Sequence, residues 1–167
     1  MGRESPQPKS ATRTTEPRWL DDDQLASWRT LATLTVRLPW ALERQLQQDA
    51  ELSFMEYHVL ARLSEEPDRQ LRMSVLAELT SSSLSRLSHL VKRLEARGYV
   101  YRAPDQTNGR FTVATLTDLG YTKLAATAPN HVNEVRRLVI DRLSADELRL
   151  LGDLADRLVE GIERADP

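Results

Sequence analysis

The sequence predicts a mainly α-helical protein with one small β-hairpin, and three observations support this fold class. From Leu20 onward the chain follows a helical pattern of apolar residues. Several of the expected helices begin with capping residues. Two β-prone runs surround an Asn-Gly pair, which is a strong hairpin signal. The length of 167 residues allows one domain, or two closely joined lobes, with a real hydrophobic core.

Residues 1–18 are expected to form a disordered tail that precedes the first helix. The segment holds three prolines, and its only apolar side chains are Met1 and Ala11. Burial of so little apolar surface cannot offset the entropy lost on ordering the segment.

Three helix starts carry the capping-box pattern, in which two side chains three residues apart satisfy each other's backbone amides. These are Asp21-x-x-Gln24, Ser53-x-x-Glu56 and Ser144-x-x-Glu147, and Thr117 marks a fourth start. We therefore expect helices at about 21–48, 53–64, 74–80, 82–97, 117–140 and 144–164. Pro39 and Pro129 fall inside two of these helices and are expected to kink or interrupt them.

Between the fourth and fifth helices the pattern changes from helical to β. Residues 99–102 and 111–116 are β-prone, and the PDQTNG segment between them ends in Asn108-Gly109. We expect a hairpin with a long tip, and residues 71–73 are a candidate third short strand.

Charge is unevenly distributed along the chain. The formal net charge is -2, which excludes a strongly basic nucleic-acid-binding protein but not a local basic face. Residues 72–110 carry +4, whereas residues 19–71 carry -5 and residues 111–167 carry -3. The basic segment holds a short helix, a tight turn, an amphipathic helix and the hairpin. This order is that of a winged helix-turn-helix.

The amphipathic helix at 82–97 has two distinct faces. Leu84, Leu87, Val91 and Leu94 are spaced to face the core. The other side presents Ser82, Ser83, Arg86, His89 and Arg93. Small hydroxyls let a helix N-terminus approach phosphates, and an arginine such as Arg86 can read guanine in the major groove. Arg110 follows the hairpin turn, so the segment predicts binding of double-stranded DNA.

These motifs resemble the multiple-antibiotic-resistance regulator (MarR) family of winged helix-turn-helix transcription factors, over about residues 21–164. The main carriers are RLSHLVKRLEARG at 86–98, Asn108-Gly109-Arg110 and LTDLG at 116–120, together with LSFMEYHVL at 52–60. The resemblance implies a helical dimerisation lobe of residues 19–50 and 117–164 and a DNA-binding lobe of residues 51–116. It also implies a homodimer on a pseudo-palindromic operator, and repression is the family's commoner mode.

The resemblance suggests specific DNA contacts. They are Ser83, Arg86, Ser88, His89 and Arg93 on the recognition helix, Arg110 on the wing, and Arg72 and Ser74 near the DNA backbone. Asn108 stands where the family's wing usually has an aspartate that braces the arginine. Ser88-His89 replaces the frequent Thr-Arg, a variant associated with actinobacterial members. His89 is either a base or phosphate contact or a solvated surface imidazole.

Members of this family often bind a small aromatic or phenolic effector between the two lobes, and such a ligand is expected to weaken DNA binding. Five residues could line a site of this kind here, namely Trp28, Leu31, Trp40, Tyr57 and His58. The favoured alternative is that these residues are core or dimer contacts.

Other functions find less support in the sequence. Cysteine is absent, the histidines are scattered, and no nucleotide-binding or hydrolase motif is present, so we expect no enzyme activity, cofactor or resident metal. A metal-responsive site of Glu56, His58 and His131 is a weak alternative. A winged helix that docks on proteins is another, and the basic segment argues against it. No apolar run is long enough to cross a membrane, and we expect a cytoplasmic protein.

Overall fold

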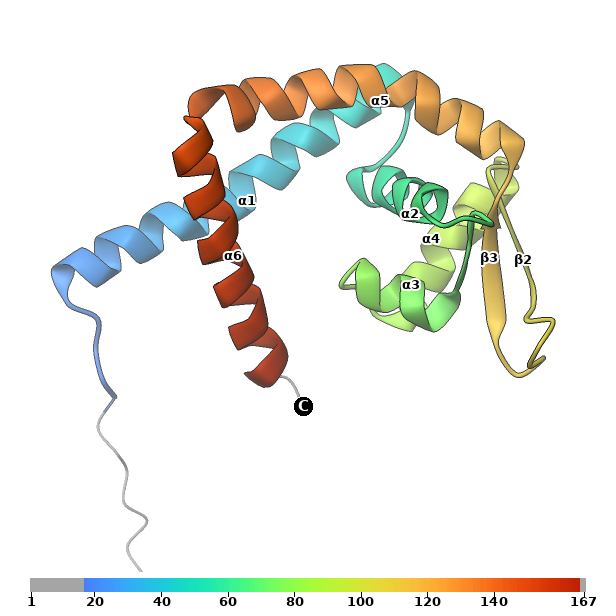
Figure 1. Cartoon of the computed structure of the whole chain (residues 1–167), viewed down its shortest axis with the longest axis horizontal. Coiled ribbons are helices and arrows are strands. Elements are labelled where there is room, and N and C mark those ends of the chain that lie inside the picture. Colours follow the sequence, from blue (N-terminus) through green and yellow to red (C-terminus); the bar gives the residue numbers. More distant parts are fainter. Residues whose placement is uncertain (1–16, 166–167) are drawn as a thin grey trace, which may run out of the picture. The chain divides into compact units, whose positions relative to one another are not determined.

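The computed structural model describes residues 17–165, so most of the expected tail, residues 1–16, lies outside it. The described elements are, in chain order, α1 (Asp22–Ala50), α2 (Phe54–Glu65), β1 (Gln70–Arg72), α3 (Met73–Leu79), α4 (Leu84–Ala96), β2 (Val100–Pro104), β3 (Thr112–Leu116), α5 (Asp118–Leu138), the 3-10 turn η1 (Ile140–Arg142) and α6 (Ala145–Ala165) (Figure 1). The chain divides into two compact units, Met1–Thr35 and Val36–Pro167, and the boundary falls within α1. The predicted fold class is confirmed: long helices accompany a winged helix-turn-helix with a small antiparallel sheet.

All three predicted capping boxes are formed. In each, the N-cap side chain accepts a hydrogen bond from the backbone amide three residues later. The side chain of that later residue accepts a hydrogen bond from the N-cap amide in return. The pairs are Asp21 with Gln24, Ser53 with Glu56, and Ser144 with Glu147. The fourth predicted start is also confirmed, because the Thr117 hydroxyl accepts the Gly120 amide at 3.0 Å. These local hydrogen bonds fix where four of the helices begin.

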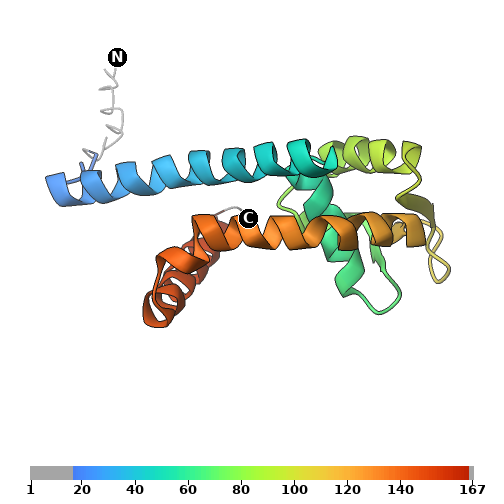
Figure 2. The ribbon, with the colours of Figure 1, turned by 90° about the horizontal axis from the view of Figure 1, so that it is seen from above.

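Neither internal proline interrupts its helix. α1 continues through Pro39 and α5 continues through Pro129, and both run unbroken in Figure 2. Of the two expected outcomes, the interruption is therefore wrong, and a kink at either proline stays a prediction. A proline removes one internal hydrogen bond, and the helical turns on both sides keep all the others. α5 ends at Leu138, slightly before the predicted boundary, and passes into the 3-10 turn η1.

The sheet has three antiparallel strands in the order β1-β3-β2. β2 and β3 form the predicted hairpin, in which Val100 faces Leu116 and Pro104 faces Thr112. β1 pairs with the other edge of β3, so the candidate third strand is confirmed, one residue earlier than expected. Met73 belongs instead to the first turn of α3. The helix-turn-helix is thus joined directly to the sheet.

The core of the unit Val36–Pro167 lies between α2, α3, α4, α5 and the sheet. Its largest fully buried side chains are mostly leucines, namely Leu46, Leu52, Leu60, Leu63, Leu76, Leu87 and Leu94, together with Val59 and Val91. Leu84 is the exception in the predicted apolar stripe of α4. Its side chain is 55% exposed, so its assignment to the core is wrong. The first helical residue projects beyond the region that α3 and the sheet cover.

The LTDLG motif forms the joint between the wing and α5. The Thr117 hydroxyl donates to the Gly98 carbonyl oxygen at 2.7 Å while it caps α5. Gly98, at φ +73°, ends α4 in the left-handed conformation that glycine adopts without strain. Gly120 packs so closely that a Cβ atom there would overlap the Tyr99 carbonyl oxygen. These contacts hold the start of α5 against the end of α4.

The C-terminal helix α6 has no buried residue in this chain. Its apolar side chains form an exposed set of Leu150, Leu151, Leu154, Leu158, Val159 and Ile162. Within the described part of the chain, no helix combines the length and the apolar character needed to span a membrane.

Candidate nucleic-acid interface

Helix α4, the expected recognition helix, begins at an exposed serine-rich turn. Ser83 is its N-cap, and its hydroxyl accepts the Arg86 amide at 3.3 Å. Ser85, His89 and Lys92 lie on the same exposed face of the helix. The buried side chains of Leu87, Val91 and Leu94 anchor the opposite face. α4 therefore presents a row of small polar and basic side chains to solvent from a fixed backbone.

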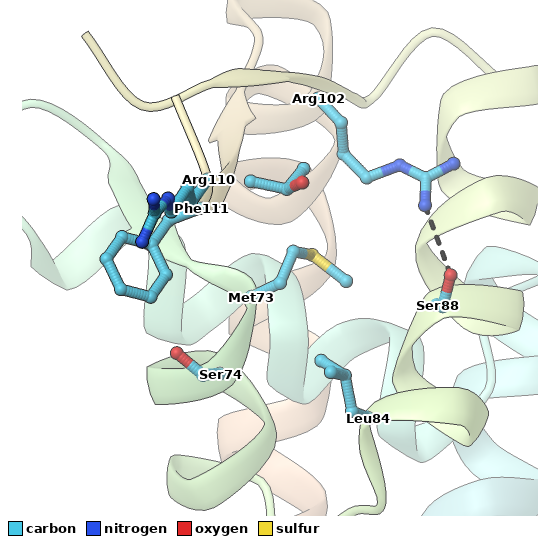
Figure 3. Close-up of a pocket in the computed structure, with 8 residues that line it drawn as sticks. Met73, Ser74, Leu84, Ser88, Arg102, Arg110 and Phe111 are labelled. Carbon is cyan, nitrogen blue, oxygen red and sulfur yellow. Dashed lines mark hydrogen bonds between the residues drawn. The ribbon is translucent and has the colours of Figure 1, made fainter. Parts of the chain in front are cut away.

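One hollow borders α4 on the side of the wing. It has a volume of about 270 Å³ and is lined by Met73, Ser74, Leu84, Ser88, Arg102, Arg110, Phe111 and Thr112. Figure 3 shows Arg110 and Phe111 on one side of it and Arg102 and Ser88 on the other. Three of the predicted DNA contacts, Ser74, Ser88 and Arg110, thus meet at one place although they come from α3, α4 and the wing.

A second hollow borders α4 on the side of α2. It has a volume of about 580 Å³ and is lined by Ser53, Met55, Thr80, Ser81, Ser82, Arg86, Leu90 and Arg93. Both hollows are open and contain hydroxyl and guanidinium groups. The exposed row Ser85, His89 and Lys92 falls between the two sets of α4 residues on the helical wheel. α4 is consequently a ridge with a basic hollow on each side.

Arg93, a predicted DNA contact, is bound to a buried carboxylate. Its Nε donates to Glu56 Oε1 at 3.1 Å, and Glu56 Oε2 accepts the Ser53 amide at 3.0 Å. Arg97 adds a hydrogen bond to the Glu51 carbonyl oxygen at 2.8 Å. Glu56 therefore joins the start of α2 to the middle of α4. The Arg93 side chain remains 59% exposed, so part of its guanidinium still faces the hollow.

A second ion pair joins α4 to strand β2. Arg102 donates to Glu95 Oε2 from Nε at 2.9 Å and from a terminal nitrogen at 2.6 Å, and its other terminal nitrogen reaches the Ser88 hydroxyl at 3.2 Å. The hydrogen bond from Arg102 is the main reason that the pKa of Glu95 lies below its usual value. Ser88 is half-buried and partly committed to this contact. The pair sets the position of the wing relative to the recognition helix.

The tip of the wing is organised by Asp105, a residue that the sequence analysis did not single out. A hydrogen bond from the Thr107 hydroxyl, followed by one from the Arg72 guanidinium, holds the pKa of this carboxyl well below its usual range. Arg72 Nε lies 2.6 Å from Asp105 Oδ2. Asn108 Oδ1 accepts the backbone amide of Arg110 at 3.2 Å. Asn108 thus braces the backbone of the wing arginine, and Arg72 is tied to the wing.

The cations of residues 72–110 fall into two groups. Arg72, Arg93, Arg97 and Arg102 each form an ion pair. Within residues 17–165, the side chains of Arg86, Lys92 and Arg110 have no hydrogen-bonding or acidic partner. All three of these side chains are exposed. The uncompensated positive charge of the segment is therefore on the ridge, beside it, and at the wing tip.

The five predicted effector-binding residues are distributed over both units. Trp28 and Leu31 belong to the unit that ends at Thr35. Trp40, in the other unit, is exposed, and the Arg44 guanidinium lies 4.9 Å from its ring centroid. Tyr57 and His58 are half-buried on α2, and burial raises the pKa of Tyr57 and lowers that of His58.

The alternative metal site of Glu56, His58 and His131 is not assembled. Glu56 is occupied by Ser53 and Arg93, as described above. His131 Nδ1 lies 3.1 Å from Gln45 Oε1, and its ring packs against Tyr57 at a centroid distance of 4.3 Å. Across residues 17–165, no group of three or more histidine, aspartate or glutamate side chains is placed to hold a metal ion.

The chain is similar to known members of one family of transcriptional regulators. The sequence model of the MarR family matches residues 50–110, which include α2, the helix-turn-helix and most of the wing. The crystal structure of Sco3205, a MarR family transcriptional regulator from Streptomyces coelicolor in complex with DNA, is 42% identical with a TM-score of 0.85. The match covers 87% of this chain and 91% of that one.

Two further relatives agree with this result. The crystal structure of AbsC, a MarR family transcriptional regulator from the same organism, is 35% identical with a TM-score of 0.84, over 88% of this chain and 99% of that one. The HTH-type transcriptional regulator YxaD of Bacillus subtilis (strain 168) is 27% identical over 126 residues, which cover 75% of this chain and 86% of YxaD.

Proposed function

The chain belongs to the MarR family of transcriptional regulators, and from this premise we propose that it is a sequence-specific regulator that binds double-stranded DNA through α4 and the wing. The observation that carries the proposal is the geometry of α4. This helix is a ridge with two basic hollows beside it, and Arg86, Lys92 and Arg110 are left without acidic partners among residues 17–165.

The ridge has the size and chemistry that the major groove requires. A B-DNA major groove admits one α-helix, with a sugar–phosphate strand on each side of it. The two hollows beside α4 are suited to receive these strands, because hydroxyls and guanidinium groups are phosphate donors. The relative Sco3205 was crystallised in complex with DNA, which supports the same mode here.

The individual roles follow from the position of each side chain. We assign base contacts to Ser85 and His89, which lie on the exposed row of α4, and to Arg86, which lies near the N-terminus of α4 at the edge of the hollow beside α2. Ser85 was not among the residues predicted from the sequence. The phosphate contacts assigned are Ser74, Ser82, Ser83, Ser88, Arg93 and Lys92 beside α4, with Arg110 and Asn108 on the wing and Arg72 behind it.

The regulator acts as a homodimer in this proposal. The exposed apolar face of α6 would be unfavourable in water, and a second copy of the chain would cover it. The lobe boundaries proposed are residues 51–116 for DNA binding and residues 19–50 and 117–164 for dimerisation. Such a dimer would read a pseudo-palindromic operator in the cytoplasm, and repression is the mode we propose.

Release by a small aromatic or phenolic ligand is the further step of the proposal. Its support is the half-buried pair Tyr57 and His58 on α2 and the family premise. A panel of aromatic acids should then change the tryptophan fluorescence and weaken operator binding. If no acid alters either quantity, ligand release is excluded for this class of compound.

Arg86→Ala tests the assignment of base contacts. We expect the variant to lose preference for the best operator, at a cost of roughly 1–3 kcal/mol, while it keeps binding to random DNA. Binding of a labelled operator and of a shuffled duplex, measured at several salt concentrations, provides both quantities. Arg62→Ala is the matched control, because Arg62 pairs with Glu65 on α2. Unchanged preference in Arg86→Ala would refute its assignment as a base contact, whereas binding without salt dependence in the wild type would favour a protein-docking winged helix.

A further inference from the structure

The loop between β2 and β3 is folded around one carboxylate. Asp105 Oδ1 accepts the Thr107 amide at 2.8 Å, the Thr107 hydroxyl at 2.6 Å and the Asn108 amide at 3.2 Å. The Asp105 amide in turn donates to the Phe111 carbonyl oxygen at 2.9 Å. Side-chain hydrogen bonds of this kind select one turn conformation from the many open to a polar loop.

A residue from a distant part of the chain holds the same carboxylate. Arg72, at the end of β1, donates from Nε to Asp105 Oδ2 at 2.6 Å. The guanidinium of Arg72 also lies 4.7 Å from the ring centroid of Phe111. As a result the Asp105 side chain is only 10% exposed, although it belongs to the wing tip. We call Arg72, Asp105 and Phe111 the wing clasp.

Arg110 is attached to the loop that the clasp shapes. Its backbone amide donates a hydrogen bond to Asn108 Oδ1. The next residue, Phe111, closes the loop through two backbone hydrogen bonds, one with Asp105 and one with Asn108. The guanidinium of Arg110 itself has no partner within residues 17–165 and is exposed. The direction in which Arg110 points is therefore set by the backbone of the loop and not by a bond to its own side chain.

We propose that Asp105, held by Arg72, is the positioning residue of the wing and fixes the loop conformation from which Arg110 reaches the DNA backbone. The inference rests on the proposed function and adds to it a residue that contacts no DNA. A preordered loop avoids the entropy cost of ordering when DNA binds. Removal of the carboxylate should thus weaken DNA binding by way of Arg110, while the buried core keeps its packing.

The test compares Asp105→Ala, Arg110→Ala and the double variant in the full-length protein. The probe is a pool of random-sequence duplexes of about 30 base pairs, long enough for two half-sites, because a phosphate contact acts on any sequence. Arg110→Ala should lower the affinity about tenfold for each protomer that contacts the duplex, as for loss of a charged hydrogen bond. It should also reduce the slope of log affinity against log salt by about one for each of these contacts, and so by about two for the proposed dimer.

Asp105→Ala should reproduce both effects, and the double variant should bind no more weakly than Arg110→Ala alone. Such non-additivity is the mark of two residues that act through one contact. Asp118→Ala is the matched control, since it breaks another exposed ion pair, with Arg69 at 3.1 Å, away from the wing tip. This control should bind DNA as the wild type does.

The inference is overturned if Asp105→Ala binds DNA like the wild type. It is also overturned if the affinity lost in Asp105→Ala adds in full to the affinity lost in Arg110→Ala when the two changes are combined. Should Asp105→Ala fail to fold by circular dichroism, Asp105→Asn takes its place, because an amide keeps one acceptor for the loop and removes the charge that Arg72 holds. A wild-type protein that shows no salt-dependent binding to the duplex pool refutes the proposed function itself. Failure of the positioning role alone therefore gives a different result.

Discussion

Two titratable side chains, Glu56 and His131, are buried where helices of the unit Val36–Pro167 pack together. Glu56 receives hydrogen bonds from Ser53 and from the Arg93 guanidinium. His131 contacts Gln45 and the ring of Tyr57, and burial lowers the pKa of its imidazole. A neutral histidine is favoured at this position.

The lowered pKa of His131 predicts how stability depends on pH. Because the folded-state pKa lies below the unfolded value of about 6.5, the unfolded chain binds more protons in the interval between them. The contribution of His131 to the free energy of unfolding should therefore be complete above about pH 6.5 and should decrease as the pH falls below that value. His58, whose pKa burial also lowers, adds to the same trend.

Chemical denaturation of the wild type and of His131→Gln at pH 7.5 and at lower pH values measures this effect. Glutamine retains a hydrogen-bonding group for Gln45 but does not titrate, so the pH dependence of the variant should be smaller. The part that remains is assigned to His58. Equal pH dependence in the two proteins would show that the titration of His131 is not coupled to folding.

At the scale of elements, the joint between α4, the wing and α5 is closely packed. Thr117 caps α5 and bonds to Gly98, and Gly120 has no space for a side chain beside the Tyr99 carbonyl. Through this joint the start of α5 is fixed to the end of the recognition helix. In the proposed dimer, such a rigid connection would hold the two recognition helices at a set spacing.

Gly120→Ala should disrupt this joint and lower the free energy of unfolding by about 1–3 kcal/mol, because a methyl group would be forced against backbone atoms. Gly109→Ala is the matched control. Gly109 lies in the loop between β2 and β3, where a Cβ atom would meet nothing within 4 Å, and alanine should keep or slightly raise the free energy of unfolding. The midpoints of urea unfolding measure the stability of both variants. Equal stability of the two would contradict the tight packing at Gly120.

The elements that could be predicted from sequence are those whose signals are local. Each capping box involves residues three positions apart, and the hairpin is marked by its own turn, so both were predicted close to their observed bounds. The helical spacing of apolar residues placed Leu84 in the core. In the fold, however, Leu84 is exposed, because the neighbouring elements do not extend over the first residue of α4. The same limitation applies to Pro39, whose effect depends on how much helix lies on either side.

The parts of the site that could not be predicted depend on contacts between distant residues. Arg72 and Asp105 are 33 positions apart, and Glu56 and Arg93 are 37 positions apart. Charge patterning identified residues 72–110 as basic but could not separate the paired arginines from the unpaired ones. The fold was needed to show that Arg86, Lys92 and Arg110 are the cations without acidic partners among residues 17–165.

At the scale of the whole molecule, an acidic chain with a net charge of -2 carries a basic ridge and wing. This separation favours approach of DNA to one face only. The unpartnered apolar face of α6 supports a symmetric dimer, in which two such ridges would be presented together. In this proposal, the dimer reads two half-sites of one operator.

Selection of binding sites from random duplex DNA, with the purified full-length protein at moderate salt, tests this claim most directly. We expect enrichment of an inverted repeat whose half-sites are about 10 base pairs apart, one helical turn along the duplex. Absence of any enriched sequence, from a sample shown to be folded and dimeric, would contradict it.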